Sequence, residues 1–559
     1  MSLKITHKYS TAAGTPPASG DIDVGEIAIN AADAELYTKD NAGNVRKFQN
    51  TTTGTADGLQ FTQAGTGAVQ RTVESKLQDV VSVLDFSTLA EAFTYCIDNS
   101  KKLNVPSGQT VVVPTDCPTL QDAFNIARSN GTITVQIATG TTLSDGLVLE
   151  NGDWSNFTIT SVDAQVLIGS GFAAEEDIIY SVNASCPRIA TVFNGQSLYG
   201  RNGFYLQGSS IYINESCGVV NIGGTGTGTN TSGVIGGGLV LIRSTAYCRN
   251  STFTGNDDIN LFCTQGSQVY GDFGTFTGAK GDANVYIGRG STGSVSYSNM
   301  SDATTGTGLR VRRSICVALS CTATGNAGYG ILAEEGAYVV ANDQSTTPSD
   351  FSNNTIAALK VVETSMLDAA GCTATGTAKG LIAETGSTVN LSNCNITSSN
   401  TTLDITDSTV VLNSSALSSS TRGALCSRGK MIGTGTSITT SANEAIYALQ
   451  GSTLSLPSLT LSGGARGLRL VGSVKADCPS CSITGWSTAG VDISNLSTVN
   501  LYQGTVAEGV LTSCISLTRG CTVVATSCTT SNSAGTPALG DTNVASFNAI
   551  STNLGVIYV

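Results

Sequence analysis

The stretch Gly380–Asn395, GLIAETGSTVNLSNCN, is one copy of a unit that recurs through the second half of the chain. The unit begins with a small residue and an apolar strand, turns at Gly or Ser, continues as a second alternating strand, and closes near a Cys or Ser. Gly330–Val340 (GILAEEGAYVV) and Gly467–Cys481 (GLRLVGSVKADCPSC) follow the same order, and the pentapeptide CTATG occurs at Cys321–Gly325 and Cys372–Gly376. Such self-similarity is typical of a stacked repeat protein.

The repeat favours strands over helices. Apolar residues alternate with polar ones at period two, and the units are rich in Thr, Ser, Val, Asn and Gly. The Leu/Asn skeleton of a leucine-rich repeat is absent, and units of roughly 20–28 residues are too short for propeller blades. We therefore predict an all-β parallel β-helix with about thirteen coils between residues 238 and 533. The first apolar residues of the aligned units are Leu239, Leu261, Val285, Leu309, Ile331, Leu359, Leu381, Leu403, Leu425, Ala448, Leu468, Val491 and Ile515.

The 16 cysteines follow the repeat rather than a disulfide or metal pattern. Cys478 and Cys481 form a single CxxC motif, whereas a zinc site needs a second pair of ligands at suitable spacing. Several cysteines share one offset from the first apolar residue of their coil, so we expect them to stack inside the β-helix as small hydrophobes. These are Cys321, Cys372, Cys394, Cys481 and Cys528.

Composition excludes several classes of function. The 559 residues carry a net charge of −13, which argues against a nucleic-acid partner. No apolar run approaches the ~18 residues that a membrane helix needs, so we expect no membrane insertion, and Met1–Ser10 lacks the apolar core of a signal peptide. The single histidine, His7, excludes a Ser-His-Asp triad or a multi-histidine metal site in the body of the chain. We expect no metal and no cofactor.

The N-terminal 50 residues form a separate module. Val24–Asn30 and Glu35–Lys39 read as strands, and Asn41–Asn44 reads as a turn. The segment GEIAINAADAELYTKDNAGNVRKF resembles the N-terminal segment of many phage tail fibres, particularly those of marine phages, and that of phage major tropism determinants. The resemblance implies a small β domain near the virion end of a fibre, docked on tail adaptor, nozzle or baseplate proteins.

A second resemblance follows. Val69–Phe86, VQRTVESKLQDVVSVLDF, resembles the neck of phage tailspikes, which leads into a pectate-lyase-like, right-handed parallel β-helix. The family continues with Gly-Ala and an Asp-rich segment, whereas this chain continues with Ser87-Thr88-Leu89. The resemblance implies a homotrimer on the virion tail, made in the host bacterial cytoplasm and acting outside the cell at the host surface.

Two short helices are expected before the repeats, at Thr88–Asn99 and Pro118–Ala127, where the second is placed to cover the open end of the first coil. The expected divisions are a virion-attachment β domain (1–50), a linker and neck (51–86), capping helices and first strands (87–131), the β-helix (132–535), and a C-terminal cap or trimerisation segment (536–559).

The repeat register brings possible catalytic carboxylates together. It puts Glu334 and Glu384 at the same turn position, with Glu363 one residue later in the coil between them. Coils one step apart would place carboxyls ~5 Å apart, near the ~5–5.5 Å of retaining glycosidases. Arg312 falls beside Glu334, Arg313 over Glu335, and Arg289 one coil earlier. A second possible cluster is Asp257, Asp258 and Asp282. The alternative is a solvated face of structural ion pairs.

Three functions fit these observations. The first is a tailspike that binds host surface polysaccharide, with possible glycan contacts at Arg289, Arg312, Arg313, Tyr199 and Tyr205, and also Phe204 and Tyr212. The second is a polysaccharide depolymerase, either hydrolase or lyase, of the same architecture. The third is a purely structural fibre subunit. Two tryptophans and 6% aromatic residues lean against an enzyme, because sugar-processing clefts use aromatic platforms.

Overall fold

The computed structural model describes residues 8–48, 60–61, 71–72, 80–172, 176–197, 201–223, 234–342, 347–508, 513–517, 520–532 and 556–558. The chain divides into two compact units, one of Met1–Ser87 with Tyr95–Asn104 and one of Thr88–Thr94 with Val105–Val559. Most of the expected linker and neck, and nearly all of the expected C-terminal segment, lie outside the described residues.

The first unit contains a four-stranded sheet in the order β1 (Lys8–Ser10), β2 (Ile27–Asn30), β3 (Glu35–Lys39) and β4 (Val45–Phe48). Strands β1 and β2 are parallel, and the other neighbours are antiparallel. A small core of Ile22, Ala28 and Tyr37 holds the sheet together. The unit also contains β5 (Gln60–Phe61), β6 (Arg71–Thr72), β7 (Val80–Ser82), the 3-10 helix η2 (Val83–Asp85) and β8 (Lys102–Asn104).

Two polar residues of the N-terminal motif organise its loops. Asn30 is 1% exposed, and its amide donates to the carbonyls of Ala12 and Thr15 and to the carboxylate of Asp33. Asp40 accepts the backbone N–H groups of the turn that joins β3 to β4, with Oδ1 at 2.9 Å from the nitrogen of Asn44. Because an unsatisfied buried polar group is costly, Asn30 fixes the conformation of the loops around it. Asp40 holds the β3–β4 turn from a half-buried position.

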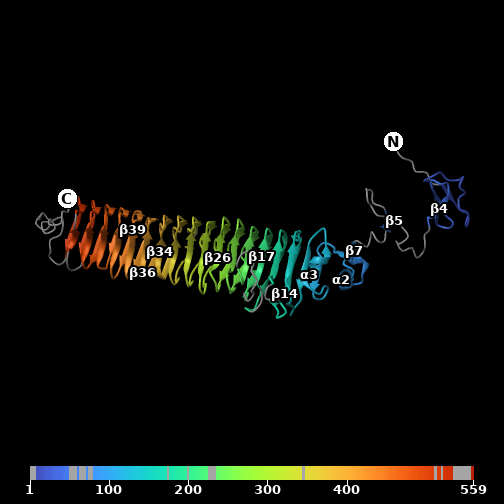
Figure 1. The fold of residues 1–559 in the computed structure, drawn as a ribbon, viewed down its shortest axis with the longest axis horizontal. Helices are drawn as coiled ribbons and strands as arrows, with labels where there is room; N and C mark the ends of the chain where they lie inside the picture. Colours follow the sequence, from blue (N-terminus) through green and yellow to red (C-terminus); the bar gives the residue numbers. More distant parts are fainter. Residues whose placement is uncertain are drawn as a thin grey trace. The chain divides into compact units, whose positions relative to one another are not determined.

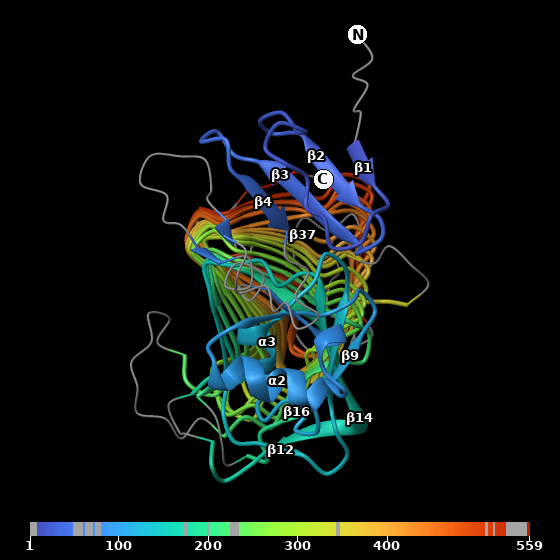
Figure 2. The same cartoon turned by 90° about the vertical axis from the view of Figure 1, so that its right-hand side faces the viewer.

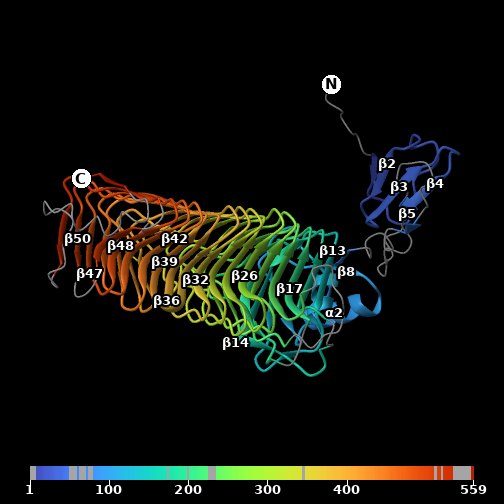
Figure 3. The same cartoon turned by 60° about the vertical axis from the view of Figure 1, so that its left-hand side comes forward.

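The second unit is a parallel β-helix, as the sequence predicts, and it has about 18 turns. Its coils stack in chain order from the cyan end near α3 to the red end (Figure 1), and in Figure 3 the strands of successive coils run side by side. Viewed along the stack, the strands lie behind one another (Figure 2). Two helices precede the regular coils, α2 (Leu89–Asp98) and α3 (Leu120–Ile126), with β10 (Ala127–Arg128) after α3.

Helix α3 covers apolar surface of the first coils. Thr119 caps its N-terminus by accepting from the nitrogen of Asp122 at 3.0 Å. Leu120, Ala123 and Phe124 are buried, and the ring of Phe124 stacks on Phe157 with 4.8 Å between centroids. The helix is thus placed as a solenoid requires at its open end.

One long sheet carries the first strands of the coils, joined later by a further strand from each coil. Its strands are β13 (Leu147–Glu150), β15 (Ile179–Val182), β17 (Asn202–Gln207), β20 (Gly237–Ile242), β23 (Leu261–Thr264), β26 (Ala283–Gly288), β28 (Thr307–Arg312), β30 (Tyr329–Glu334), β32 (Ala357–Val361), β34 (Thr373–Ala383), β36 (Asn395–Thr406), β38 (Ala416–Ser419), β39 (Arg422–Ser427), β41 (Ser437–Thr440), β42 (Glu444–Leu449), β44 (Thr460–Ser462), β45 (Arg466–Val471), β47 (Ser482–Trp486), β48 (Ala489–Ser494), β50 (Thr505–Glu508), β51 (Ser513–Leu517) and β53 (Thr529–Asn532).

The other strands form the remaining walls of the coils. They are β9 (Thr110–Val113), β11 (Ile133–Ile137), β12 (Thr142–Leu143), β14 (Phe157–Ile168), β16 (Ser185–Asn194), β18 (Ser210–Ile213), β19 (Gly218–Val220), β21 (Thr245–Tyr247), β22 (Thr252–Thr254), β24 (Gln268–Tyr270), β25 (Thr275–Thr277), β27 (Thr292–Ser294), β29 (Ile315–Val317), β31 (Tyr338–Val340), β33 (Met366–Asp368), β35 (Thr388–Asn390), β37 (Thr409–Val411), β40 (Lys430–Ile432), β43 (Thr453–Ser455), β46 (Lys475–Asp477), β49 (Thr498–Asn500), β52 (Thr522–Val524) and β54 (Val556–Tyr558).

The predicted register is confirmed from Leu239 to Leu403, where each aligned residue pairs with the next. It is wrong at two positions. Leu403 pairs with Ala424 rather than Leu425, and Ala424 pairs with Ile446 rather than Ala448. At the first, a small alanine points inward and the larger Leu425 lies on the half-buried outer face. The predicted pairing resumes at Leu468 and continues to Ile515.

The predicted cysteine column is also present. The residue after each of the five cysteines belongs to one continuous ladder, so the cysteines share one position on the coil. Cys372 and Cys394 lie in adjacent coils with their sulfur atoms 3.3 Å apart. Burial raises the pKa of Cys321 and of Cys481 to about 12. Cys528, near the end of the stack, is half-buried. These thiols fill the core.

Buried amides form a second column. Asn260 donates to Asn284 at 2.9 Å, Asn284 donates to Asn326 at 3.2 Å, and Asn326 donates to Asn354 at 2.9 Å. All four residues are fully buried. Each amide satisfies its neighbour in the next coil, so the column is stable only while every member is present.

Candidate functional site

The predicted charged residues gather where the first strand of each coil ends. Four of them occupy one turn position in consecutive coils, with φ of 54° at Arg289, 50° at Arg313, 56° at Glu335 and 57° at Glu363. Non-glycine residues rarely adopt this left-handed conformation, so each turn is tight. The four side chains are exposed or half-buried and form a charged edge along the β-helix.

Arg310, which the sequence pattern did not single out, links two of the predicted acidic groups. It lies on the outer face of β28, and its Nε donates to Oε1 of Glu334 in the next coil at 2.7 Å. Its Nη1 donates to Asp282 of the preceding coil. Asp282 and Glu334 therefore belong to one surface, although the sequence suggested two separate clusters.

Glu335 is neutralised by two arginines. The guanidinium of Arg312 contacts its Oε1, and Nε of Arg313 lies 2.6 Å from its Oε2. The hydrogen bond from Arg312 is the main cause of a lowered pKa at Glu335. A carboxyl that stays ionised at neutral pH cannot act as a proton donor. Glu335 therefore fits the structural ion pair, which the sequence offered as the alternative to catalysis.

Of the three predicted glutamates, Glu334 and Glu384 do not form a close pair of carboxyls. Val362 occupies the position between Glu334 and Glu384, so these two lie two coils apart. Two coils correspond to ~9–10 Å of stacking, more than the ~5–5.5 Å of a retaining glycosidase. Glu363 is level with the arginine-bound Glu335, since the nitrogen of Gly336 donates to the carbonyl of Glu363.

The aspartate cluster is better placed for acid–base chemistry. Asp258 and Asp282 lie in adjacent coils, at equivalent positions before β23 and β26. Burial raises the pKa of Asp258, and the backbone hydrogen bond from Asp282 offsets part of that rise. Asp257, by contrast, is paired with Lys280 at 2.5 Å. Two carboxyls in unlike environments are the arrangement that acid–base catalysts use.

The predicted tyrosine contacts need correction. Tyr205 is 2% exposed, because Val234, Val240 and Ile259 pack around it on the outer side of β17, so it presents no surface to a ligand. Phe204 is fully buried in the coil. Tyr199 lies outside the described residues.

An exposed row of aromatic rings lies elsewhere on the coils. Tyr212, Tyr247 and Tyr270 pair in register on the outer faces of β18, β21 and β24, and we call them the tyrosine ladder. Their ring centroids are 6.4 and 4.9 Å apart. In the turns that follow β24 and β27, Phe273 and Tyr297 stack with 4.8 Å between ring centroids and form what we call the turn pair.

Sequence reasoning singled out Tyr212 and missed the rest of the ladder. The tripeptides Ser210–Tyr212, Thr245–Tyr247 and Gln268–Tyr270 share a polar–apolar–Tyr order that would have identified it. The alignment followed the first strand of each coil, whereas the ladder is on the second.

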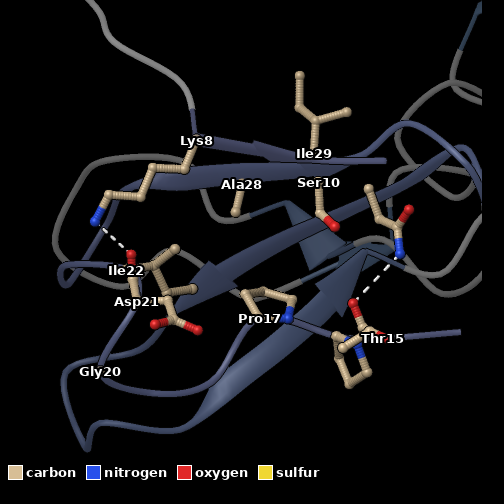
Figure 4. A pocket seen from close by; sticks show the side chains of 11 residues that line it. Lys8, Ser10, Thr15, Pro17, Gly20, Asp21, Ile22, Ala28 and Ile29 are labelled. Atoms are coloured by element: carbon tan, nitrogen blue, oxygen red, sulfur yellow. Dashed lines mark hydrogen bonds between the residues drawn. The ribbon is translucent and has the colours of Figure 1, made fainter. Parts of the chain in front are cut away.

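The N-terminal unit contains a pocket of about 770 Å³ between β1, β2 and the proline-containing loop. Figure 4 shows Lys8 at its rim, with Nζ directed to the carbonyl of Asp21, and Pro17 and Ile22 beneath. The pocket lies next to the loops that Asn30 fixes.

Among the described residues, no three His, Cys, Asp or Glu side chains come together as metal ligands. In the same part of the chain, no helix is long and apolar enough to cross a membrane.

Comparison with known proteins gives structural matches alone. No protein-family model matches the sequence, and no curated protein matches it. The chain is similar to the tailspike protein of E. coli bacteriophage HK620 in complex with pentasaccharide, at 15% identity and a TM-score of 0.27, over 85% of this chain and 82% of that chain. Two point mutants of that tailspike with pentasaccharide match at 14% identity, with TM-scores of 0.28 and 0.29, over 85% of this chain and 83% and 82% of those chains. The parallel β-helix fold follows from the register of its coils.

Proposed function

We propose that this chain is a phage tailspike that attaches to the virion tail through residues 1–50 and binds host surface polysaccharide through its β-helix. The observation that carries the proposal is the joining of two parts in one chain. The segment that resembles phage tail-fibre N-termini folds as its own small β-sheet, with Asn30 and Asp40 of the motif fixing its loops. The chain then continues into a long parallel β-helix, the body that the tailspike resemblance implies.

Two proteins test this assignment. The full chain and a variant lacking residues 1–50 are each applied to bacterial cells and to an array of bacterial capsules and lipopolysaccharide O-chains. Both should bind the same cells and glycans, and only the full chain should assemble onto tail particles that lack their spike. If neither protein binds cells, the proposed function is contradicted and the purely structural fibre subunit remains.

We include a homotrimer in the proposal. Ile315, Tyr338 and Met366 pair in register on the outer faces of β29, β31 and β33 and are 50%, 42% and 49% exposed. An exposed apolar row of this kind is suited to burial against another copy of the chain. Sedimentation equilibrium should give three times the chain mass of 57.0 kDa. A double variant, Tyr338→Asp with Met366→Asp, should lower that mass, and an unchanged mass would remove the row from the interface.

Depolymerase activity is the second candidate, favoured by the raised pKa of Asp258 beside Asp282. Hydrolysis needs one carboxyl to donate a proton and another to act as base or nucleophile. Release of reducing ends from a bound polysaccharide would support a hydrolase, and absorbance of unsaturated uronate would support a lyase. Binding without either product would leave the non-enzymatic tailspike.

A further inference from the structure

We propose that the tyrosine ladder and the turn pair, with Arg188 and Arg249, form the glycan-binding surface of this chain and that the glycan is an anionic polysaccharide. The inference rests on the proposed function, because it assigns a place and a ligand class to the polysaccharide binding stated there. The aromatic rings of this surface are exposed, so core packing does not explain why they are aromatic.

The exposure of the rings is uniform. Tyr212, Tyr247 and Tyr270 are 47%, 48% and 43% exposed, and Phe273 and Tyr297 of the turn pair are 42% and 43% exposed. Further along the stack the ladder position is taken by Ser294, and then by valines, Asp and Asn. The aromatic run is therefore confined to a few neighbouring coils and is not a requirement of the fold.

The turn pair departs from ordinary backbone preference. Phe273 and Tyr297 have φ of 60° and 57°, a region that bulky side chains seldom occupy. The same turn position holds Asn250 one coil before and Ser320 one coil after, both with positive φ. Small polar residues serve that turn well, so the two aromatic rings are there for what their side chains contact. Strain of this kind is found at functional sites.

The exposed parts of these rings are their edges and hydroxyl groups. The rings of Tyr247 and Tyr270 are inclined by 5°, and those of Phe273 and Tyr297 by 11°, so each covers the face of its neighbour. Ring edges carry partial positive charge. The hydroxyls of the ladder tyrosines donate no hydrogen bond to a described residue. They repeat once per coil, at steps of ~4.8 Å, and a hydroxyl-rich polymer could accept from them in sequence.

The arginines beside the rings indicate which class of hydroxyl-rich polymer this surface binds. The guanidinium of Arg188 lies 4.2 Å from the ring centroid of Tyr212, and that of Arg249 lies 4.8 Å from that of Phe273. Neither arginine has an acidic partner within the described residues, whereas Arg310, Arg312 and Arg313 are all paired. Asp272, which lies one coil after Arg249, accepts from Ser294 and Ser296. Because arginine binds carboxylate and phosphate through two parallel hydrogen bonds, the surface suits uronate or phosphate groups.

A hollow of about 350 Å³ lies at one end of the ladder. Its walls include Ser155, Arg188, Ser210, Tyr212 and Tyr247, which supply hydroxyls, one guanidinium and two rings. A concave site with a few convergent polar groups is the usual form of a sugar subsite. The hollow gives the polymer a fixed register against the ladder.

The test compares polysaccharide binding by matched variants of the full chain. One variant carries Tyr212→Phe, Tyr247→Phe and Tyr270→Phe, which remove only hydroxyls. A second carries Arg188→Gln and Arg249→Gln. The control is Tyr502→Ala, a tyrosine that is 42% exposed but lies outside the ladder. The probes are polygalacturonate, hyaluronate, neutral dextran and the array glycan that the native chain binds. Thermal unfolding and sedimentation mass are measured for each variant.

The native chain should bind acidic glycans more tightly than dextran, and more weakly as salt rises. Each variant should bind about tenfold or more weakly, as expected for loss of two or more hydrogen bonds to charged or polar groups, with unchanged mass and the control unaffected. Unchanged affinity in both variants would place the glycan elsewhere, overturning this inference and leaving the proposed function intact. A change in mass would make the face a contact between subunits and overturn it. Preference for dextran would overturn the anionic class. Absence of all glycan and cell binding by the native chain would overturn both proposals.

Discussion

The guanidinium of Arg310 lies 2.7 Å from the carboxylate of Glu334, although the backbone ladder pairs Glu334 with Arg312. Arg312 turns instead to Glu335. Arg310 and Arg312 therefore reach across the register to Glu334 and Glu335, whereas Arg313 pairs with Glu335 at its own turn position. This matching leaves little net charge for a ligand and separates the face from the unpaired arginines beside the tyrosine ladder.

The pairing of Glu335 predicts a loss of stability in acid. Its pKa is lowered in the folded chain by Arg312, so the folded state binds fewer protons than the unfolded state as pH falls. The contribution is complete above the unfolded value of about 4.3 and is lost as pH falls through the lowered folded value. Unfolding temperatures measured across this window should fall less steeply for Glu335→Gln than for the native chain. Parallel curves would show that the ion pair contributes nothing.

The small residue at the start of each repeat leaves no room for a larger side chain, which predicts that substitution there destabilises the fold. A Cβ at Gly380 would lie 2.6 Å from the carbonyl oxygen of Thr402 in the next coil, and one at Gly330 would lie 2.6 Å from that of Ala358. Gly380→Val should therefore destabilise the fold by about 1–3 kcal/mol, since neither backbone can move without breaking the ladder. Calorimetry of this variant should show a lower unfolding temperature. Gly20→Val, at a position with open space around it, is the control, and equal shifts in the two variants would refute the steric cause.

The sequence predicted the parts of the fold that depend on residue type at a fixed offset. Leu309, Ile331 and Leu359 identify their own ladder because each is a large apolar residue at the same offset in its coil. The predicted register is wrong at Leu425 because Ala424, which occupies the inward position, is as small as the residues that usually precede the strand. Arg310 was missed because a guanidinium can reach either neighbouring coil, and the choice is one of rotamer rather than register. Tyr205 was misplaced because its burial depends on Val234 and Ile259, which come from other coils.

The buried asparagine column predicts a large effect from one amide. Asn326 accepts from the backbone nitrogen of Ala303 at 2.9 Å and from the side-chain amide of Asn284, and it donates to the side-chain oxygen of Asn354. Asn326→Ala leaves at least one buried donor without an acceptor. We therefore expect the free energy of unfolding to fall by about 1–3 kcal/mol for each unsatisfied group. Asn413→Ala, on the exposed side of a coil, should change the unfolding temperature little. Similar unfolding temperatures for the two variants would mean that water replaces the lost amide.

The environment of Asp258 predicts how a catalytic role would show itself. Burial raises its pKa, so its protonated form persists to higher pH than in an exposed aspartate. If the chain cleaves the glycan it binds, Asp258→Asn should abolish turnover while affinity is kept, because the proton donor is lost and the shape is not. Turnover by the native chain should decline as pH rises through the raised pKa. Asp257→Asn, which loses only the pair with Lys280, is the matched control. Full turnover by Asp258→Asn would exclude the cluster, and equal losses in both variants would point to a disturbed loop rather than to a missing acid.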